Sequence, residues 1–411
     1  MPLNIIIAGG GIGGLAAAAG FRQDGHHVTV FEQAKALSEV GAAIGLGPNA
    51  MGSLQRLGVR ERLAAEAVRP RAWTHRRWID GSLLGAYDLH GSAEARFGHP
   101  FWMVHRGDLY NALLQGAVDP NLAGAPADLR LGERIVAVHN GDDYAEVESA
   151  DGKRYRGDLV IGADGVRSRV RESLFGRDEP IFSGNAVVRV QLPTQYMLTV
   201  PELKPFVEDE SIETWLGPGA HILHAPISAG RIFNFSVCFT DNAIGPETWF
   251  TLGNKADLLE KVNGWFPPIL EIIERGELVG RWDVYDRDPL ETWFLGRTVL
   301  IGDAAHPMIP YLGQGGAQTL EDAVALVDVL RDATPSDIPT ALVRYEEFRK
   351  PRAQRVQKSS RDKRDIYHLS DGLEQRARDA ADGGKGDLND FNWVWQLPEA
   401  PGRRAAGSQR I

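Results

Sequence analysis

The sequence predicts an α/β protein in which a parallel sheet flanked by helices carries an inserted, mostly antiparallel sheet. Three observations support this prediction. A glycine-rich βαβ pattern occupies residues 3–32, two more apolar strands near residues 160 and 300 each end in an Asp-Gly or Gly-Asp pair, and strands of alternating polarity fill residues 211–240. A C-terminal helical segment and tail complete the chain.

Composition restricts the class of protein. The chain has 411 residues, 43% of them apolar, a formal net charge of −10 and a single cysteine, Cys238. The acidic balance disfavours nucleic acid or an anionic membrane as the main partner, because both require a basic surface. One cysteine allows neither an internal disulfide nor a thiolate metal site, and no apolar stretch approaches the roughly 20 residues that cross a bilayer. We expect a cytoplasmic protein without a metal.

The βαβ unit begins with a β-branched run at residues 3–8. An alanine-rich helix is expected from Leu15 to Asp24, and "HVTVFE" predicts a second strand that ends at Glu32. The turn before the helix has G-x-G-x-x-G spacing, which allows a tight turn, close approach of the backbone to a pyrophosphate, and packing of the helix on the strand. A carboxylate at Glu32 suits ribose hydroxyls. The pattern predicts a bound dinucleotide, NAD or FAD, in contact with Gly9, Gly11, Ile12, Gly13, Gly14, Glu32 and Gln33.

Two later motifs discriminate between these cofactors. "DLVIGADG" places Asp164 after a buried strand, and "TVLIGDAAHP" places Gly302 and Asp303 after another. A glycine cluster at 313–316 then precedes a helix expected from Ala317, so a second positive helix end is predicted. One pyrophosphate needs only one such end, whereas a reduced flavin ring carries negative charge that a second helix end can stabilise. The later motifs therefore favour FAD.

The segment between these motifs predicts an antiparallel meander, "SIETWLG", "HILHAPI" and "RIFNFSVCFT", with "SAG" joining the last two strands. Period-two alternation gives the last strand one dry face and one face suited to a pocket. The apolar face carries Phe233, Phe235, Val237 and Phe239, and the other carries Asn234, Ser236 and Cys238.

The three motifs together resemble the class A FAD-dependent aromatic hydroxylases, a group of flavoprotein monooxygenases, in their salicylate-hydroxylase-like branch. The resemblance covers roughly residues 3–370 and includes "GPNAM", "HRGDL", "DRDPL" and "HLSDGLEQRARD". It implies a p-hydroxybenzoate-hydroxylase-type fold, with a Rossmann-like FAD-binding domain, an inserted β-sheet substrate domain and a C-terminal helical segment. The implied domains are 1–72, 100–180 and 281–350 for FAD, 73–99 and 181–280 for substrate, and 351–411 for the C-terminal helix and tail, where we expect Trp393 and Trp395 to dock.

The resemblance also implies roles for individual residues. Glu32 would bind the adenosine ribose, and Asp303 the ribityl or ribose hydroxyls of FAD. The alternatives are that Asp303 caps a turn and that Arg106 is a surface arginine. The remaining implied contacts with FAD or with the nicotinamide cofactor are Arg106, Asp164, Arg167, Gly302, Pro310, Gly313, Gly315, Gly316 and Ala317.

The implied reaction uses NADH or NADPH to reduce FAD, forms a flavin hydroperoxide with O2, and hydroxylates a small phenolic or hydroxy-aromatic acid. A base near the substrate hydroxyl would assist the reaction. His224 is the first candidate, with a packed strand histidine as the alternative, and Pro310 is expected beside the reacting ring. Ala225 stands where the family often has tyrosine, which leaves the substrate open.

Other polar residues have two readings. His221 and His224 lie three apart on one strand and point to opposite faces, which argues against a shared metal. His306 is expected to support the FAD loop. Arg287 is expected at the interface of the sheet and the FAD domain, although it and Arg189 are also candidates for a substrate carboxylate.

Three other functions stay open at this stage. An NAD-dependent dehydrogenase explains the first glycines but leaves the later motifs without a role. A flavin enzyme of the same fold could act on a heterocycle or form an epoxide, and a flavin-binding protein without turnover is the third. The pattern is equally compatible with a monomer or a homodimer, and separates NADH from NADPH only by a slight preference for NADH.

Overall fold

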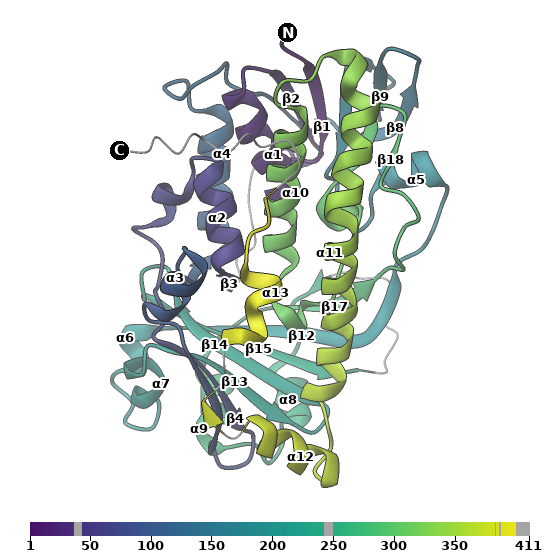
Figure 1. Ribbon diagram of the computed structural model, residues 1–411. Helices are drawn as coiled ribbons and strands as arrows, with labels where there is room; N and C mark the ends of the chain where they lie inside the picture. The colour runs from purple at the N-terminus through teal and green to yellow at the C-terminus, as the bar shows by residue number, and fades with distance from the viewer. Residues whose placement is uncertain (37–42, 242–249, 383, 386–387, 400–411) are drawn as a thin grey trace, which may run out of the picture.

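A six-stranded sheet forms the upper half of the computed structural model, which describes residues 1–36, 43–241, 250–382, 384–385 and 388–399 (Figure 1). Its order is β18-β19-β11-β1-β2-β7, and every pair is parallel except the edge pair β18–β19. The three strands predicted near residues 5, 160 and 300 therefore lie side by side. Their bounds are β1 Asn4–Ala8, β2 His27–Glu32, β7 Asp128–Leu131, β11 Leu159–Gly162, β18 Phe294–Leu295 and β19 Thr298–Leu300.

Helices pack against this sheet around the alanine-rich helix α1 (Ile12–Gln23), which contacts both α4 (Arg106–Val118) and α10 (Gly315–Leu330). Both α1 and α10 start earlier than expected and include glycines in their first turns. A Cβ on Gly13 would lie 2.7 Å from Cγ2 of Thr319, so the missing side chain lets the two helix starts approach each other. Helix α2 (Pro48–Arg56) lies beside α10.

The lower half is a nine-stranded sheet of order β16-β17-β12-β15-β14-β13-β4-β5-β20. It is mostly antiparallel, with parallel pairs at β13–β4 and β20–β5. The predicted meander forms β13, β14 and β15 in consecutive antiparallel pairs. The strands are β4 Ala72–Arg77, β5 Leu83–Asp88, β12 Ile181–Pro193, β13 Ile212–Gly217, β14 Ala220–Ile227, β15 Ile232–Thr240, β16 Phe250–Thr251, β17 Glu277–Asp286 and β20 Gly384–Lys385.

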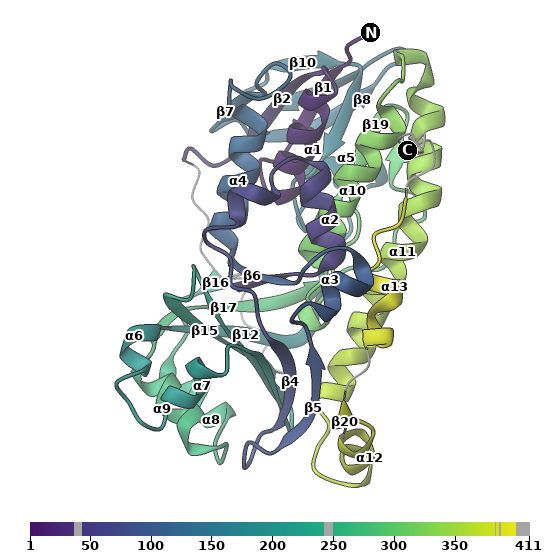
Figure 2. The same cartoon turned by 60° about the vertical axis from the view of Figure 1, so that its left-hand side comes forward.

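One face of this sheet forms a hydrophobic core with short helices on the outside of the molecule (Figure 2). Phe233, Phe235, Val237 and Phe239 lie in that core, as the period-two pattern predicts. The opposite face, which carries Ser236 and Cys238, is directed toward the upper half. The outer helices are α6 Thr194–Met197, α7 Lys204–Glu208, α8 Lys255–Lys261 and α9 Pro267–Arg275.

Two smaller sheets and three short helices lie outside the two large sheets. A three-stranded sheet, a two-stranded sheet and three further helices surround the two halves. They are β8 Ile135–Asn140, β9 Ala145–Ser149, β10 Arg154–Gly157, β3 Ala43–Leu46, β6 Trp102–His105, α3 Ser92–Phe97, α5 Arg169–Phe175 and α12 Leu373–Asp382.

Helix α11 (Ile338–Tyr367) runs beside both halves (Figure 1). Its 30 residues span about 45 Å at 1.5 Å per residue. The boundary placed between residues 350 and 351 therefore falls inside one continuous helix. After it, α13 (Asn392–Trp395) docks on the protein with Trp395 buried and Trp393 partly covered by Arg355; residues 400–411 of the expected tail lie outside the described residues.

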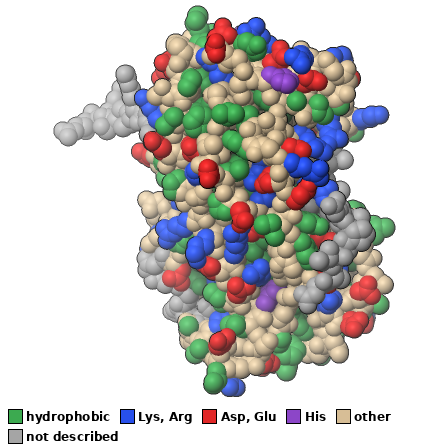
Figure 3. Space-filling model, turned by 90° about the vertical axis from the view of Figure 1, so that its right-hand side faces the viewer, with side chains coloured by type: hydrophobic (Ala, Val, Ile, Leu, Met, Phe, Trp, Pro, Cys, Tyr) green, Lys and Arg blue, Asp and Glu red, His purple; other side chains and the backbone are tan. Residues whose placement is uncertain are grey.

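Acidic and basic side chains are interspersed over the face shown in Figure 3. In the described part of the chain, no helix has the length and apolar character needed to cross a membrane. Those same residues contain no group of three or more His, Cys, Asp or Glu side chains arranged to hold a metal ion.

Candidate active site

A cavity of about 490 Å³ lies between the two sheets and is lined by both halves. The N-terminal glycine turn, the Asp-Gly loop after β11, and the segment from Ile301 to Gly316 all reach it. The three separated motifs thus meet around one space, as a single FAD requires. Another depression, of about 530 Å³, lies on the outside between α1, α2 and α10, and its lining includes none of the predicted site residues.

The glycine turn has the geometry that its spacing predicts. Gly9 has φ +105°, and a Cβ there would lie 2.4 Å from the carbonyl oxygen of Ala163. A Cβ on Gly14 would lie 1.9 Å from the oxygen of Gly9, so a side chain is excluded where helix meets strand. At Gly11, by contrast, a Cβ would have no atom within 4 Å. Gly11 lines the cavity, so its bare backbone leaves room for a ligand.

Glu32 supports this turn from the end of β2. Its Oε2 atom accepts a hydrogen bond from the backbone nitrogen of Gly10 at 2.8 Å, and its Oε1 atom accepts one from Ala34 at 2.8 Å. Gln33, the next residue, is exposed. Glu32 and Gln33 are outside the cavity lining, whereas Gly11, Ile12 and Gly13 are part of it.

Asp303 and Arg106 bring opposite charges to the cavity. Asp303 lines the cavity and is exposed to it. Burial raises the pKa of the Asp303 carboxyl, and the nearby charges of His306 and Arg106 oppose that rise. Burial also lowers the pKa of Arg106, and the nearby charge of Asp303 opposes that decrease. A carboxylate facing open space is suited to accept hydroxyl hydrogen bonds from a sugar or ribityl chain.

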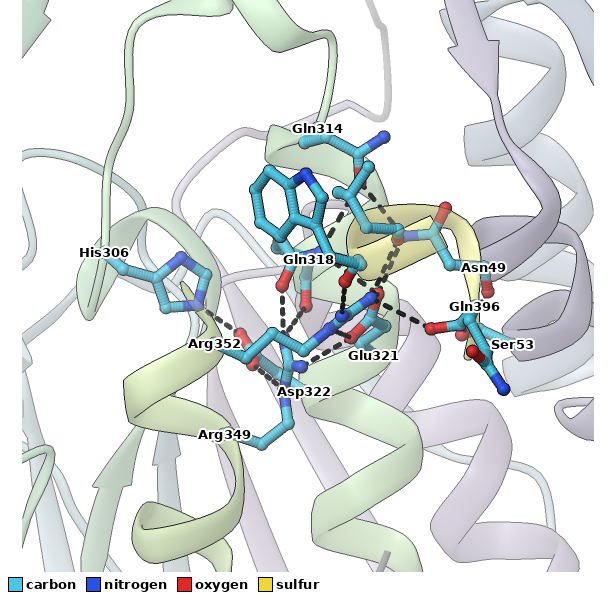
Figure 4. A network of polar contacts seen from close by, with 12 residues as sticks. Asn49, Ser53, His306, Gln314, Gln318, Glu321, Asp322, Arg349, Arg352 and Gln396 are labelled. Atoms are coloured by element: carbon cyan, nitrogen blue, oxygen red, sulfur yellow. Dashed lines mark hydrogen bonds and ion pairs between the residues drawn. The ribbon is translucent and has the colours of Figure 1, made fainter. Parts of the chain in front are cut away.

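A buried ionic network that includes His306, Asp322 and Arg349 is drawn in Figure 4. Through Asp322 it holds the Gly302–Asp303 turn. Oδ2 of Asp322 accepts the backbone N–H of Gly302 at 2.9 Å and lies 2.5 Å from Nε2 of His306. Arg349 from α11 donates through Nε to Asp322 at 2.9 Å and through Nη1 to Glu321 at 2.5 Å. His306 therefore supports the turn, and it lies outside the cavity lining.

The same network reaches the glycine cluster and the C-terminal segment (Figure 4). Asn49 donates to Gln314 at 3.0 Å and to Glu321 at 2.7 Å. Arg352 also binds Glu321, and donates to the carbonyl oxygens of Val394 at 2.8 Å and Gln396 at 3.2 Å. Arg349 and Arg352 were not predicted from the sequence. The signal for them was a carboxylate pair, Glu321 and Asp322, inside a mostly apolar helix, because such charges require partners when they are buried.

The Asp-Gly motif is used differently from the expectation. The carboxylate of Asp164 accepts hydrogen bonds from Ser168 Oγ at 2.5 Å and from the backbone nitrogens of Arg169 at 2.7 Å and Val170 at 3.2 Å. It therefore binds the start of α5 and lies outside the cavity lining, and Arg167 is exposed on the surface. Gly165 is the motif residue that lines the cavity.

The structure corrects the expectation that His224 acts as the base. The imidazole of His224 is fully buried on the core face of the sheet, where it packs parallel to Phe235 with ring centroids 5.9 Å apart. Its Nε2 atom lies 3.1 Å from both Glu213 Oε2 and Trp215 Nε1. The side chain points away from the cavity and has no access to a substrate there. The position of His224 therefore matches the alternative given above, a histidine packed within a strand.

His221 lies on the other face of the same strand and lines the cavity. It is paired with Cys238 of β15, whereas His224 is paired with Phe235, so the two histidines follow opposite faces of the sheet. The sequence correctly predicted that the two histidines point to opposite faces. It did not predict that His221, and not His224, is the one that faces the cavity. The cavity face of three adjacent strands forms a wall of six side chains: Val187, Arg189, Leu223, His221, Ser236 and Cys238.

Of the two arginines considered for a substrate carboxylate, Arg287 and Arg189, only Arg189 lines the cavity. Arg287 donates to the carbonyl oxygens of Val166 at 2.9 Å and Asp178 at 2.7 Å, and so joins the end of β17 to the segments that flank α5. Arg189 lines the cavity with its guanidinium 4.2 Å from the ring centroid of Trp282. Burial lowers the pKa of Arg189 to about 10, and no carboxylate of the described residues forms an ion pair with it.

The start of α10 closes the cavity opposite this wall. Gly313 has φ +62°, which favours glycine, and a Cβ there would meet no atom within 4 Å. Ala317 is buried behind the lining. Trp395 of α13 also lines the cavity, a contact that the sequence did not predict. The segment contributes Pro310, Gly313, Gly315 and Gly316 to the lining.

The family described as "FAD binding domain" matches residues 3–360 of the chain. The 3-amino-4-hydroxybenzoate 2-monooxygenase PtmB3 of Streptomyces platensis is 36% identical over 398 residues, 97% of each chain. The 3-hydroxybenzoate 6-hydroxylase of Polaromonas naphthalenivorans is 34% identical over 92% of this chain and 90% of its own.

Two solved structures share the fold over nearly the whole chain. Klebsiella pneumoniae HpxO, complexed with FAD and uric acid, superimposes with a TM-score of 0.83 at 26% identity and covers 96% of each chain. A salicylate hydroxylase substrate complex has a TM-score of 0.80 at 27% identity, over 96% of this chain and 95% of its own. With the open glycine turn, the Asp303 carboxylate and the two helix starts around one cavity, the chain belongs to the FAD-binding-domain family and, within it, to the FAD-dependent aromatic monooxygenases.

Proposed function

We propose that this enzyme hydroxylates a hydroxy-aromatic acid, with O2 and NADH or NADPH as co-substrates. The observation that carries the proposal is the wall of six side chains, which presents a guanidinium and an imidazole at opposite corners of one cavity surface. Adjacent strands lie about 4.8 Å apart and alternate residues about 6.8 Å, so the Cα atoms of Arg189 and His221 are separated by about 12 Å. The two side chains have room to hold opposite ends of one small ring.

Arg189 is proposed to bind the carboxylate. A half-buried guanidinium without a carboxylate partner among the described residues favours an anion in the cavity. A carboxylate matches the guanidinium with two parallel hydrogen bonds, and such charge-assisted pairs are stronger than neutral ones. The relatives named above act on compounds whose names contain a benzoate group and a ring hydroxyl.

His221 is proposed to accept the proton of the ring hydroxyl. Burial lowers its pKa well below the ordinary value, so the ring is neutral at pH 7 and has a nitrogen able to accept a proton. Nδ1 is engaged with His368, and Nε2 has no hydrogen-bond partner among the described residues. A phenolate is a stronger nucleophile than a phenol, so this transfer activates the ring toward an electrophilic oxygen.

FAD fits the remaining residues. Asp303 and Arg106 would face its sugar and ribityl hydroxyls, Gly11 its pyrophosphate, and the start of α10 its ring. When bound, the flavin supplies the reduction and activation of O2. Pro310, Leu312 and Trp395 would restrict water in the cavity and orient the substrate ring against the cofactor.

The test uses the FAD-loaded enzyme with two probes, 3-amino-4-hydroxybenzoate and 3-hydroxybenzoate. We expect at least one probe to stimulate NADH or NADPH oxidation and to give a product that carries one oxygen atom from isotopically labelled O2. His221→Asn should lower kcat about a hundredfold, and Arg189→Leu should raise KM about tenfold or more. Stimulated oxidation without an oxygenated product from any probe would contradict the proposal.

A second candidate is oxidation of a nitrogen heterocycle. It is favoured by the similarity to HpxO, whose structure holds uric acid, and to the 6-hydroxynicotinate 3-monooxygenase of Bordetella bronchiseptica, 34% identical over 87% of this chain and 91% of its own. Turnover of urate with no turnover of the benzoates would select this candidate.

A further inference from the structure

A row of hydrogen-bonding groups leads from the cavity to the protein surface. His221 Nδ1 lies 2.9 Å from Nε2 of His368, and Nδ1 of His368 lies 3.3 Å from the hydroxyl oxygen of Thr240. His221 lines the cavity, His368 is half-buried, and Thr240 is exposed. His368 is not part of the cavity lining and so acts only through His221.

The contacts in this row are compatible with a single direction of donation. A neutral imidazole has one donor nitrogen and one acceptor nitrogen. When His221 donates from Nδ1 to His368, its Nε2 is left as an acceptor toward the cavity. Nε2 of His368 is then the acceptor, so its Nδ1 carries hydrogen and donates to Thr240. Each member can thus receive a proton on its inner side and release one on its outer side.

The backbone holds the row in place. His368 directly follows the last residue of α11, and its carbonyl oxygen accepts the N–H of Gly219 at 3.1 Å. The carbonyl oxygen of Gly219 accepts the N–H of Thr240 at 2.8 Å. One residue of the turn between β13 and β14 therefore fixes both His368 and Thr240 next to the strand that carries His221.

The surroundings oppose a positive charge on either ring. Burial lowers the pKa of His221 well below its ordinary value, with His368 and His75 as further causes. Burial and then Arg364 lower the pKa of His368 to about 4, against Asp365. The other groups that contact this pair are Tyr311, Tyr367 and Cys238. A proton taken up by His221 is unstable there, so activation of the substrate requires a way out for it.

We propose that His221, His368 and Thr240 form a proton relay that carries the phenolic proton of a bound substrate out of the cavity. The proposal rests on the proposed function. The substrate O–H bond breaks as an N–H bond forms at Nε2 of His221. The proton at Nδ1 of His221 moves to Nε2 of His368, the proton at Nδ1 of His368 moves to the hydroxyl of Thr240, and the hydroxyl proton passes to water. No electron is transferred.

The test measures proton release when a probe binds to the FAD-loaded enzyme, with a pH-indicator dye in a stopped-flow instrument. The probe is whichever of 3-hydroxybenzoate and 3-amino-4-hydroxybenzoate the wild type hydroxylates faster. His368→Gln keeps hydrogen-bonding groups but cannot shift tautomers, and Thr240→Val removes the outer hydroxyl. His139→Gln, on an exposed histidine with a side-chain exposure of 47%, is the matched control.

We expect His368→Gln to slow proton release about tenfold or more, and Thr240→Val to slow it less, because water can replace the hydroxyl. The deficit should shrink as pH rises toward the pKa of the phenol, since the probe then binds already ionised. FAD occupancy and probe affinity should stay within about twofold of the wild type. Added imidazole should restore part of the rate in His368→Gln.

Two outcomes overturn the relay. If His368→Gln releases protons at the wild-type rate, or with a deficit that does not change with pH, the relay is wrong while hydroxylation through His221 still stands. If the wild type hydroxylates neither probe, the proposed function fails for phenolic acids and the relay fails with it.

Discussion

Oδ2 of Asp322 accepts the backbone N–H of Gly302 at 2.9 Å, and this bond ties helix α10 to the turn that presents Asp303. The carboxylate is completely buried and is held in turn by Arg349 from α11. A residue outside the cavity lining thus helps to determine where the carboxylate of Asp303, which lines the cavity, lies. The position of the Asp303 carboxylate therefore depends on the ion pairs that Arg349 forms with Glu321 and Asp322.

Arg349→Met is expected to leave Glu321 and Asp322 without their main compensating charge. Removal of one partner from a buried ion pair costs about 3–5 kcal/mol, and the disturbed turn should also lose FAD. Lys358→Met breaks the exposed Lys358–Asp362 pair on the same helix and serves as the control, with a cost of about 1 kcal/mol or less. Chemical denaturation and the FAD-to-protein ratio after gel filtration measure both effects. Equal losses in the two variants would contradict this account.

Gly11→Val and Gly14→Val should separate cofactor binding from folding. The Gly11 side chain would enter open space in the cavity, so FAD affinity should fall at least tenfold while the Tm of the apoprotein stays close to that of the wild type. The Gly14 side chain would collide with the carbonyl of Gly9, so the apoprotein itself should be destabilised. Thermal melting and FAD titration decide the matter, and a Gly11→Val apoprotein that fails to fold would refute the distinction.

His224→Leu is expected to lower stability and leave chemistry intact. The variant leaves Glu213 and Trp215 without one partner in the core, which costs about 1–3 kcal/mol. Per FAD-bound molecule, kcat for a hydroxylated probe should stay within about twofold of the wild type, whereas His221→Asn should lose most of it. Steady-state kinetics normalised to bound flavin provide the measurement. A catalytic loss in His224→Leu as large as in His221→Asn would restore His224 to the active site.

Glu213 should make the enzyme sensitive to acid. Burial opposes its charge, but the hydrogen bond and charge of His224, with the charge of Arg76, lower its pKa from an ordinary 4.5 to about 2. The resulting stability is complete above about pH 4.5 and is lost as pH falls from there toward 2. Glu213→Gln should therefore be less stable at pH 7, and its free energy of unfolding should fall less steeply over that acid range. Unfolding curves at a series of pH values test this, and parallel pH profiles would disprove it.

Trp395→Ala should open the cavity at the C-terminal segment. The indole is buried, stacks on Phe391 with centroids 4.1 Å apart, and forms part of the cavity lining. Its removal should admit water and raise the hydrogen peroxide formed per NADH oxidised, because a wet cavity favours side reactions. Trp393→Ala, which removes a half-covered indole outside the lining, is the control. Unchanged peroxide yield in Trp395→Ala would show that the indole does not seal the site.

Local patterns predicted the strands and the glycine turn because each depends on nearby residues. The wrong choice of histidine came from the register of β14 against β15. The alternation on β15 already identified Cys238 as a pocket-face residue, but only the actual turn, in which Ile227 pairs with Ile232, places His221 opposite Cys238. A one-residue error in register exchanges the two faces of a strand.

Other features depend on contacts that no local pattern contains. Asp164 accepts the backbone N–H groups of Arg169 and Val170 at the start of α5, so its carboxylate is used within the protein. Trp395 reaches the cavity from the far end of the sequence because Arg352 holds the carbonyl oxygens around it. The carboxylate pair of α10 indicates that cationic partners are required, but Arg349 and Arg352 are identified as those partners only once α10 and α11 are known to be neighbours.

Helix α11 has a mechanical consequence for catalysis. Arg349 binds Asp322, which holds the Gly302–Asp303 turn. Farther along the helix, Ser360 donates to the carbonyl oxygen of Ile309 at 2.6 Å, and Arg361 binds Asp286 at the end of β17. Because helix α11 is bound at each of these points, it resists a hinge motion that would move the two halves apart. We expect substrate to enter by local movement at the rim, and calorimetry to record a single cooperative melting transition in which flavin release and collapse of the substrate sheet coincide.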